Sequence, residues 1–218
     1  MSNPQNNKAQ FQESLKNCQK FEQPYTHYIL NNLISEKLRK GLADLPFEAK
    51  DLDYKLGTRE EFNNAREYIN QEAIAKYPAA KEFADIFLSR DTISLIEKTE
   101  NISLKGSFLR IEYAIDNGNF WLKPHTDLGV KLFTMLFYIS EGQHASGWGT
   151  DVYENADIHH STIPYETNSA LVFYPTDKTW HGFKQREIVG VRKTLIINYV
   201  TDEWRNRHEL VDDVNPVY

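Results

Sequence analysis

The stretch WLKPHTDLGVKLFTMLFYIS, residues 121–140, places a histidine and an aspartate two positions apart, just before a strongly apolar run. In an extended strand, residues two apart point to the same face, so His125 and Asp127 can present an imidazole nitrogen and a carboxylate oxygen to one point. Chance alone supplies about 0.4 His-x-Asp pairs in a chain of this composition, so the pair by itself predicts little. A third ligand further along would make it a candidate metal site.

His181 supplies that third candidate, 54 residues after Asp127, in the segment DKTWHGFKQ. Two imidazoles and one carboxylate bound to one face of an Fe(II) ion leave three positions open for other ligands. We therefore expect the strand that carries His125 to lie beside the strand that begins near His181. Two simpler interpretations stay open: His125 and Asp127 as a hydrogen-bonded pair on a solvated strand, and His181 as a packed core histidine beside Trp180.

Arg192 opens the last apolar run of the chain, RKTLIINYV, and its charge needs a partner if it lies inside the protein. A small dicarboxylate could bind a metal at one end and accept a bidentate pair of hydrogen bonds from Arg192 at the other. Thr194, two residues on, shares the face of Arg192 and could add a hydroxyl donor. The alternatives are an ion pair of Arg192 with Glu187 or Asp202, and an ordinary strand-forming role for Thr194.

Other polar side chains near these segments give weaker signals. His159 and His160 are adjacent, so in a strand they would point to opposite faces, and we expect a solvated strand or loop there. His144, in EGQHASG, is expected in a loop, with substrate contact as the lesser alternative. Candidates for a cavity mouth, or else solvated residues, are Arg110, Trp121 and Lys123.

The segments that would position these residues begin near residue 104, where short apolar and β-branched runs alternate with Gly, Asn, Asp and Pro. Eight strands are predicted without helices between them, which is typical of an antiparallel sandwich or jelly roll. The predicted strands are 106–115, 120–127, 131–139, 148–153, 157–163, 169–174, 180–186 and 191–200.

The first hundred residues are predicted to be mostly helical. Ser35 is a candidate N-cap, with Pro46 as the stop of the same helix, and Thr58 and Glu61 have capping-box spacing. The predicted elements are a strand at 25–30 and helices at 34–46, 58–78, 78–89 and 91–99.

The domain organisation follows from this change of pattern. Residues 1–20 are rich in Asn, Gln and Lys and are expected to form a flexible N-terminal segment, with a weak helix as the alternative. No linker separates the helical part from the strands, so we expect a single domain over residues 21–218. In it, residues 21–103 would give mostly helical support to a jelly-roll core at 104–200.

Composition limits the class of protein. The chain has 218 residues, 40% of them hydrophobic and 26% charged, which suits a folded domain with a sizeable core. A net charge of −6 with mixed signs argues against nucleic acid as the main partner. The single cysteine, Cys18, excludes an internal disulfide, and the polar N-terminus lacks the apolar core of a signal peptide. A cytoplasmic protein without a membrane span is therefore expected, its oligomeric state left open.

The motif His125-x-Asp127, then His181 and Arg192, resembles that of the Fe(II)- and 2-oxoglutarate-dependent dioxygenases. The resemblance covers about residues 104–200 and extends to the lead-in PYTHYILNNLISEKLRKGLADLP. It is most similar to the prolyl-4-hydroxylase-like branch, on the segments FLRIEYAIDNGNF, LFTMLFYIS and GWGTDVY.

The resemblance implies a mainly β fold with N-terminal helices, whose eight-stranded core is a double-stranded β-helix (a cupin-like jelly roll). It implies Fe(II) held by His125, Asp127 and His181, with O2 and 2-oxoglutarate as cosubstrates and ascorbate as an optional reductant. The expected 2-oxoglutarate contacts are Arg192, Tyr138, Thr194 and Tyr113. The expected reaction hydroxylates a peptide side chain such as proline, or a small metabolite, and releases succinate and CO2.

The chain departs from the branch at three positions. Leu122 stands where many prolyl hydroxylases have a tyrosine, Trp148 replaces the first glycine of the usual pair, and Asn198 stands where some relatives have a bulky aromatic residue. These departures concern the substrate rather than the metal. Asp127 argues against the related halogenases, which have a small residue there to make room for halide.

Two other functions stay open. One is a non-catalytic or zinc-binding cupin-like jelly roll used as a binding protein, which needs no arginine facing a metal. The other is a nucleobase demethylase, which needs a basic groove.

Overall fold

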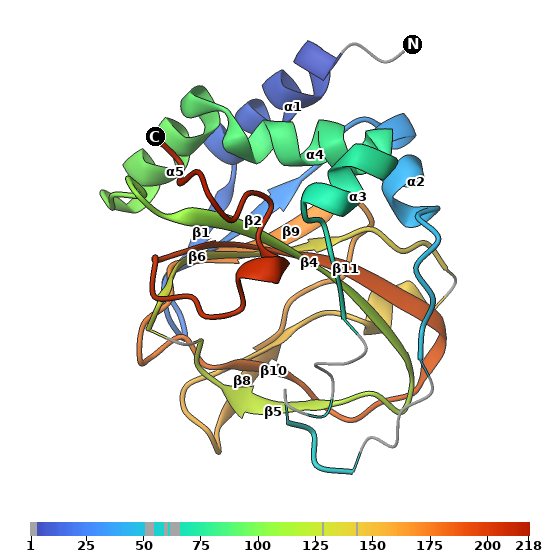
Figure 1. Ribbon diagram of the computed structural model, residues 1–218. Coiled ribbons are helices and arrows are strands. Elements are labelled where there is room, and N and C mark those ends of the chain that lie inside the picture. Colours follow the sequence, from blue (N-terminus) through green and yellow to red (C-terminus); the bar gives the residue numbers. More distant parts are fainter. Residues whose placement is uncertain (1–3, 51–54, 59–60, 62–65, 128, 143) are drawn as a thin grey trace.

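Two antiparallel sheets and a layer of helices make up the protein (Figure 1). The computed structural model describes all residues except 1–3, 51–54, 59–60, 62–65, 128 and 143. The larger sheet has seven strands in the order β1-β2-β9-β6-β11-β4-β3, and the smaller has four in the order β5-β10-β7-β8. Their bounds are β1 Gln19–Phe21, β2 His27–Asn31, β3 Glu67–Tyr68, β4 Phe108–Gly118, β5 Leu122–His125, β6 Lys131–Tyr138, β7 Asp151–Tyr153, β8 His159–Thr162, β9 Ser169–Phe173, β10 His181–Phe183 and β11 Ile188–Val200.

Each of the eight strands predicted after residue 104 overlaps an observed strand, from β4 to β11. The predicted strand at 25–30 overlaps β2. The larger sheet also takes in β1, β2 and β3 from the first seventy residues. The mainly β architecture of a jelly roll is thus confirmed, whereas a core of eight strands stays a prediction.

The helices lie on one face of the larger sheet (Figure 1). Pro78 begins α4 in the first turn, where its missing N–H costs nothing. The predicted N-cap Ser35 caps α2, because its hydroxyl accepts a hydrogen bond from the Leu38 amide. The helices are α1 Pro4–Lys16, α2 Glu36–Ala43, α3 Gln71–Lys76, α4 Pro78–Leu88 and α5 Arg90–Glu100.

The N-terminal segment differs from the flexible start expected for residues 1–20. Residues 4–16 form α1, and its side chains Phe11 and Leu15, one helical turn apart, are both buried. The ring of Phe11 packs edge-on against Phe87 of α4 at 4.9 Å. In a segment of mostly polar composition, these two apolar residues do not stand out in the sequence, yet they pack the helix against the rest of the fold.

The single helix predicted over 58–78 is wrong near its middle, where β3 interrupts it, and is helical again only over α3. Glu67 and Tyr68 pair as β3 with β4, and a new helix, α3, begins after Asn70, whose side chain accepts from the Ala73 amide. The capping-box contact between the Thr58 amide and the Glu61 carboxylate does form, at 3.4 Å. Residues 59–60 and 62–65 of the predicted helix lie outside the described residues.

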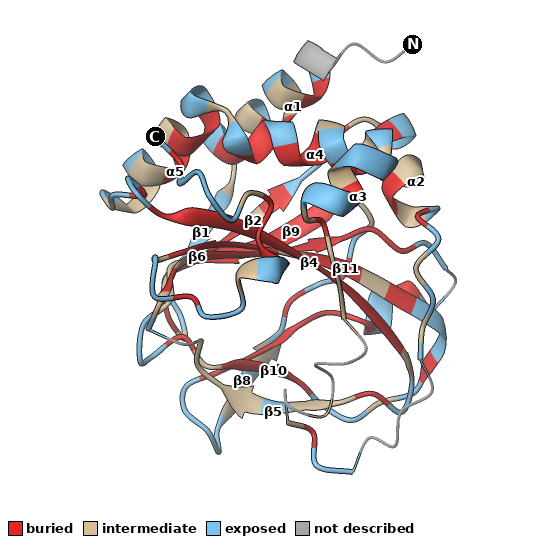
Figure 2. Ribbon diagram, in the orientation of Figure 1, coloured by how far each residue is buried: buried red, intermediate tan, exposed pale blue. Residues whose placement is uncertain are grey.

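The larger sheet separates an apolar face from a polar one. Odd-numbered residues of β4 and β11, such as Ile111 and Ile197, pack with the helices in the main core. Even-numbered residues, such as Asp116 and Thr194, face the smaller sheet and line a cavity between the two. Figure 2 shows these central strands buried along most of their length. A strand buried on both faces can therefore carry polar groups on one side without weakening the core on the other.

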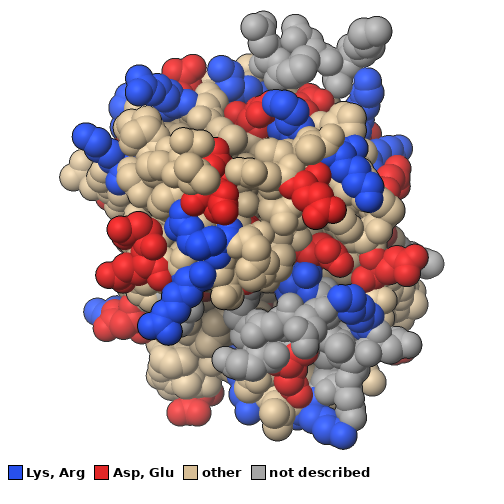
Figure 3. Space-filling model, viewed as in Figure 1, with Lys and Arg blue, Asp and Glu red and all other residues tan. Residues whose placement is uncertain are grey.

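Charges of both signs are interspersed on the face drawn in Figure 3. Among the described residues, no helix combines the length and apolar character that crossing a bilayer requires.

Candidate metal centre and adjoining cavity

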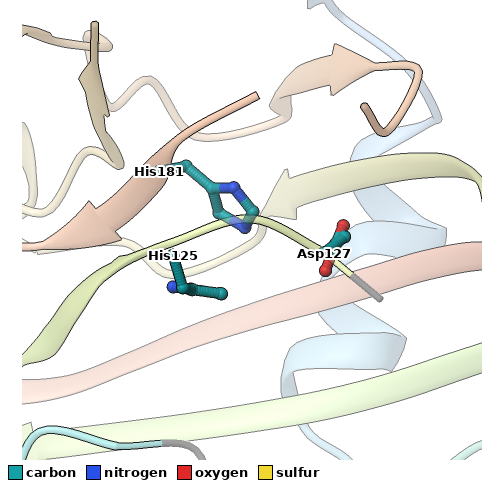
Figure 4. A group of neighbouring side chains, drawn as sticks. All are labelled: His125, Asp127 and His181. Carbon is teal, nitrogen blue, oxygen red and sulfur yellow. The ribbon is translucent and has the colours of Figure 1, made fainter. Parts of the chain in front are cut away.

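His125, Asp127 and His181 meet at one end of this cavity. Strands β5 and β10 pair antiparallel with His181 opposite His125, and their imidazole rings lie 4.4 Å apart between centroids. One nitrogen of each histidine and one oxygen of Asp127 all lie within 4.8 Å of one another. Figure 4 shows the three side chains turned toward one another. The predicted pairing of these two distant strands is therefore confirmed.

Backbone carbonyls select the tautomer of both histidines. Nδ1 of His125 lies 2.9 Å from the carbonyl oxygen of Lys123, and Nδ1 of His181 lies 3.0 Å from that of Thr179. A carbonyl only accepts, so each Nδ1 carries the proton and each Nε2 carries the lone pair. This is the arrangement in which an outer hydrogen bond prepares an imidazole for a metal.

The electrostatics keep His125 and Asp127 in the protonation states that bind a metal. Burial, with the neighbouring His181, lowers the pKa of His125 to about 3, so this imidazole is neutral at physiological pH. Burial alone would raise the pKa of Asp127. The charges of Lys131 and His181 outweigh it and, with hydrogen bonds from Lys131 and Thr134, hold that pKa well below its usual range.

Both oxygens of Asp127 have protein partners. The Lys131 ammonium forms a short ion pair with Oδ1, and the Thr134 hydroxyl donates to Oδ2 at 2.7 Å. Each carboxylate oxygen has two lone pairs, so a metal can still bind. Lys131 reaches Asp127 because the pairing of β6 with β11 shifts register between Phe133 and Lys131, and such irregularities redirect a side chain.

Replacing Lys131 by methionine should destabilise the metal-free protein and tighten metal binding by about tenfold. Without the ammonium, Asp127 is a buried carboxylate with one donor fewer, and a divalent cation no longer competes with a positive charge. Melting temperatures with and without Co(II), together with a Co(II) titration, measure both effects. Lys123→Met, at an exposed lysine of β5, is the matched control. Weaker Co(II) binding by Lys131→Met would contradict this account.

The cavity extends from the three candidate ligands to Arg192 on β11. Its walls come from both sheets, and it combines charged groups with aromatic and aliphatic ones. The lining residues are Arg66, Ala114, Asp116, Phe120, Leu122, His125, Asp127, Lys131, Thr134, Leu136, Thr150, His181, Gly182, Phe183, Arg192, Thr194 and Ile196.

Arg192 forms its ion pair with Asp116, at 2.6 Å through Nη1, and with neither Glu187 nor Asp202. Its Nε donates to the Trp148 carbonyl at 2.8 Å, and its guanidinium lies over the Phe183 ring at 4.7 Å. Nη2 has no hydrogen-bond partner among the described residues. The guanidinium is thus held firmly, with one donor nitrogen to spare.

The Thr194 hydroxyl is buried in the cavity wall without a hydrogen-bond partner in the described part of the chain. A buried hydroxyl is seldom left this way unless another molecule satisfies it. Beside Nη2 of Arg192 on the same strand face, it makes a small donor site at the far end of the cavity.

Arg66 is a site residue that the sequence analysis did not predict. It forms ion pairs with Asp116 at 2.9 Å and Glu112 at 3.3 Å, and its guanidinium lies 5.6 Å from the centre of the Phe120 ring. Asp116 is shared between Arg66 and Arg192, so its single negative charge does not fully neutralise the guanidinium of Arg192. The sequence analysis did not consider Arg66 for the site, because the helix wrongly predicted over 58–78 included it.

The two predicted tyrosines lie on opposite faces of the larger sheet. Tyr138 is on the cavity side, but its hydroxyl donates to the Thr150 hydroxyl at 2.8 Å and accepts from the Thr150 amide, which leaves it no donor to spare. Tyr113 lies in the helix-side core, where its hydroxyl donates to the Leu42 carbonyl at 2.8 Å. The structure does not bring Tyr113 into the cavity.

The remaining candidates lie elsewhere. Arg110 is fully buried in an ion-pair network rather than at a cavity mouth. His159 contacts Asp151 at 3.1 Å, while His144 and His160 are exposed. None of these three histidines lines the cavity.

Comparisons with known proteins place the fold. No protein-family model and no curated protein matches the chain. Among solved structures, it is similar to a prolyl-4-hydroxylase from Pseudomonas putida, at 14% identity over 89% of this chain and 98% of that one, with a TM-score of 0.56. It is also similar to a prolyl hydroxylase from Trichoplax adhaerens in complex with a hypoxia-inducible-factor peptide fragment, at 14% identity over 91% and 92%, with a TM-score of 0.55.

A third similar structure is HygX from Streptomyces hygroscopicus with nickel and 2-oxoglutarate bound, at 13% identity over 88% of this chain and 90% of that one, with a TM-score of 0.53. These likenesses show a shared fold. The resemblance to 2-oxoglutarate oxygenases, and to their prolyl-hydroxylase-like branch, is thereby confirmed at the level of the fold.

Proposed function

We propose that this protein is an Fe(II)- and 2-oxoglutarate-dependent oxygenase. The observation that carries the proposal is one cavity with a His125, Asp127 and His181 cluster at one end and the spare donors of Arg192 and Thr194 at the other. Two imidazoles and a carboxylate match the ligand set of non-haem Fe(II) oxygenases.

The donor set fits the metal and its cosubstrate. The Nε2 atoms of His125 and His181 and a carboxylate oxygen of Asp127 would hold the metal. Nη2 of Arg192 and the Thr194 hydroxyl would hold the far carboxylate of 2-oxoglutarate. Bound iron supplies the oxidation of a substrate C–H bond by O2, coupled to the conversion of 2-oxoglutarate to succinate and CO2.

The rest of the cavity orients the cosubstrate and excludes water. Phe120, Leu122 and Phe183 provide apolar walls between the charged ends. Tyr138 is proposed to act indirectly, by fixing Thr150 in the cavity wall.

The substrate is proposed to be a peptide side chain, such as proline, or a small metabolite, and the reaction a hydroxylation in the cytoplasm. Similar structures support both substrate classes, since one is in complex with a peptide and another, HygX, has hygromycin B bound. One domain over residues 21–218 would carry the whole site.

The test is to add 2-oxoglutarate to the Fe(II)-loaded protein without oxygen and to record the visible spectrum. A weak metal-to-ligand charge-transfer band is expected, and it should vanish in Asp127→Ala. Iron-loaded, folded protein without such a band would overturn the proposal.

One observation favours a second candidate, a zinc-binding or non-catalytic jelly-roll protein. Arg192 already has Asp116 and a backbone carbonyl as partners, so its burial does not by itself demand an external anion. The two candidates differ in what replacing Arg192 does, as set out in the Discussion.

Replacing Thr194 by valine, which has nearly the same shape, should weaken 2-oxoglutarate binding about 5- to 10-fold without loss of stability. The hydroxyl has no partner in the described part of the chain, so its removal leaves no other polar group without a hydrogen bond. Titration of the metal-loaded protein with 2-oxoglutarate, followed by the charge-transfer band, gives the affinity. Thr194→Ser keeps the hydroxyl and is the control. Equal affinity in Thr194→Val and the wild type would remove Thr194 from the site.

A further inference from the structure

Asp127 is linked to a buried arginine through two neutral side chains. The Thr134 hydroxyl donates to Oδ2 of Asp127 at 2.7 Å, Nδ2 of Asn198 donates to the Thr134 oxygen at 2.9 Å, and Nη1 of Arg110 donates to Oδ1 of Asn198 at 3.1 Å. Thr134, Asn198 and Arg110 stand in register on neighbouring strands β6, β11 and β4. The chain of contacts therefore crosses the larger sheet on its cavity face.

Each step of this chain has only one possible direction. Arginine can only donate, which makes the atom facing Arg110 the oxygen of the Asn198 amide. The nitrogen of Asn198 then donates to Thr134 and to the Phe133 carbonyl, at 3.3 Å. Thr134 has a single hydroxyl proton, and since its oxygen accepts from Asn198, that proton goes to Asp127.

Arg110 is a fixed anchor for the chain. Its side chain is 1% exposed and forms ion pairs with Glu112 at 2.6 Å and Glu209 at 2.5 Å. Its guanidinium also lies over the rings of Tyr68 and Trp204, 5.1 and 4.9 Å from their centres. With two carboxylates and two rings around it, Arg110 has little freedom to turn, so it orients Asn198.

We infer that Asn198 is a positioning residue for the metal-binding carboxylate. By fixing the direction of the Thr134 hydroxyl, it holds Oδ2 of Asp127 in one orientation while the carboxylate faces the two histidines. This inference rests on the proposed metal site. It also accounts for an amide at a strand position where the resemblance leads one to expect a bulky aromatic residue.

The test is Co(II) binding by wild type, Asn198→Asp, Thr134→Val and the double variant. A carboxylate at position 198 cannot donate to Thr134. It would instead accept the hydrogen bond that the Thr134 hydroxyl otherwise donates to Asp127. Each single change should weaken Co(II) binding about tenfold and alter the visible spectrum of the bound ion. The double variant should be no weaker than the poorer single one, because both changes break the same chain.

Thr134→Ser keeps the hydroxyl and should restore wild-type affinity and spectrum. If Asn198→Asp is folded and binds Co(II) with unchanged affinity and spectrum, the inference is wrong while the metal site stands. The inference would also be wrong if the losses of Co(II) affinity in the two single variants were additive in the double variant. Additive losses would mean that Asn198 and Thr134 act independently, not through the same hydroxyl. Absence of Co(II) binding by the wild type would overturn both the inference and the proposed function.

Discussion

Replacing His181 by alanine is expected to abolish tight metal binding and to lower 2-oxoglutarate turnover by on the order of a thousandfold or more. The variant removes one of three ligands, and the pairing of β5 with β10 brings no other described histidine into the cavity to replace it. The imidazole is buried against Phe173, with ring centroids 4.8 Å apart, so a small loss of stability should accompany the loss of activity.

The measurements are Co(II) affinity and 2-oxoglutarate consumption, with near-ultraviolet circular dichroism as the check on folding. His160→Ala, at an exposed histidine of β8, is the matched control and should bind and turn over as the wild type does. Wild-type 2-oxoglutarate consumption by a folded His181→Ala protein would be incompatible with the proposed metal centre.

The second large effect is expected at Arg192. Its replacement by leucine should weaken 2-oxoglutarate binding about 100-fold and leave Co(II) affinity within a few fold of the wild type. The guanidinium is the buried cation that the far carboxylate would meet, and it does not contact the three candidate ligands. A zinc-binding or non-catalytic jelly roll predicts no change in either quantity, so this variant separates the two candidate functions.

The buried partner of Arg192 complicates that variant. Removing the arginine leaves Asp116 with Arg66 as its remaining ion-pair partner, and breaking a buried pair costs about 3–5 kcal/mol when no other partner is left. The double variant Arg192→Leu with Asp116→Asn removes the excess negative charge. It should recover stability, measured by urea unfolding, without recovering 2-oxoglutarate binding. Recovery of binding would mean that electrostatic balance, rather than a direct contact, explains the loss.

The pairing of His125 with Asp127 could be predicted because it depends on local geometry. Two residues separated by one position share a strand face in any sheet, which pairs His125 with Asp127 whatever the fold. The same argument placed Thr194 beside Arg192. Bringing His181 to this pair needed the jelly-roll order of strands, and here the family resemblance supplied what spacing alone could not.

Lys131 shows what alternation could not predict. Counting by twos from the core residue Phe133 would turn Lys131 toward the helices, away from Asp127. The register shift between them reverses that assignment, and no residue type in the sequence marks it. The predicted 2-oxoglutarate contact of Tyr113 did not place it in the cavity for a related reason. The face on which a residue lies is known only once its strand is in register with its neighbours.

The partners of Arg192 depend on contacts between distant segments. Asp116 stands opposite Arg192 across β4 and β11, while Arg66 arrives from a segment before β3. Predicting these two ion pairs would have required the register of β4 with β11 and the path of the segment that carries Arg66. Helix α1 was only the lesser alternative for residues 1–20, because two buried apolar residues give a weak pattern in a polar stretch.

The division of the larger sheet into an apolar face and a cavity face has a consequence for how this protein could acquire new substrates. Ala114, Leu136 and Ile196 lie on the cavity face, one on each of the neighbouring strands β4, β6 and β11, and belong neither to the helix-side core nor to the proposed ligand set. Substitutions there would reshape the space around the reacting group while the layer of side chains beneath the helices kept its packing. A scaffold built this way can diverge in specificity by steps that each leave the folded state intact.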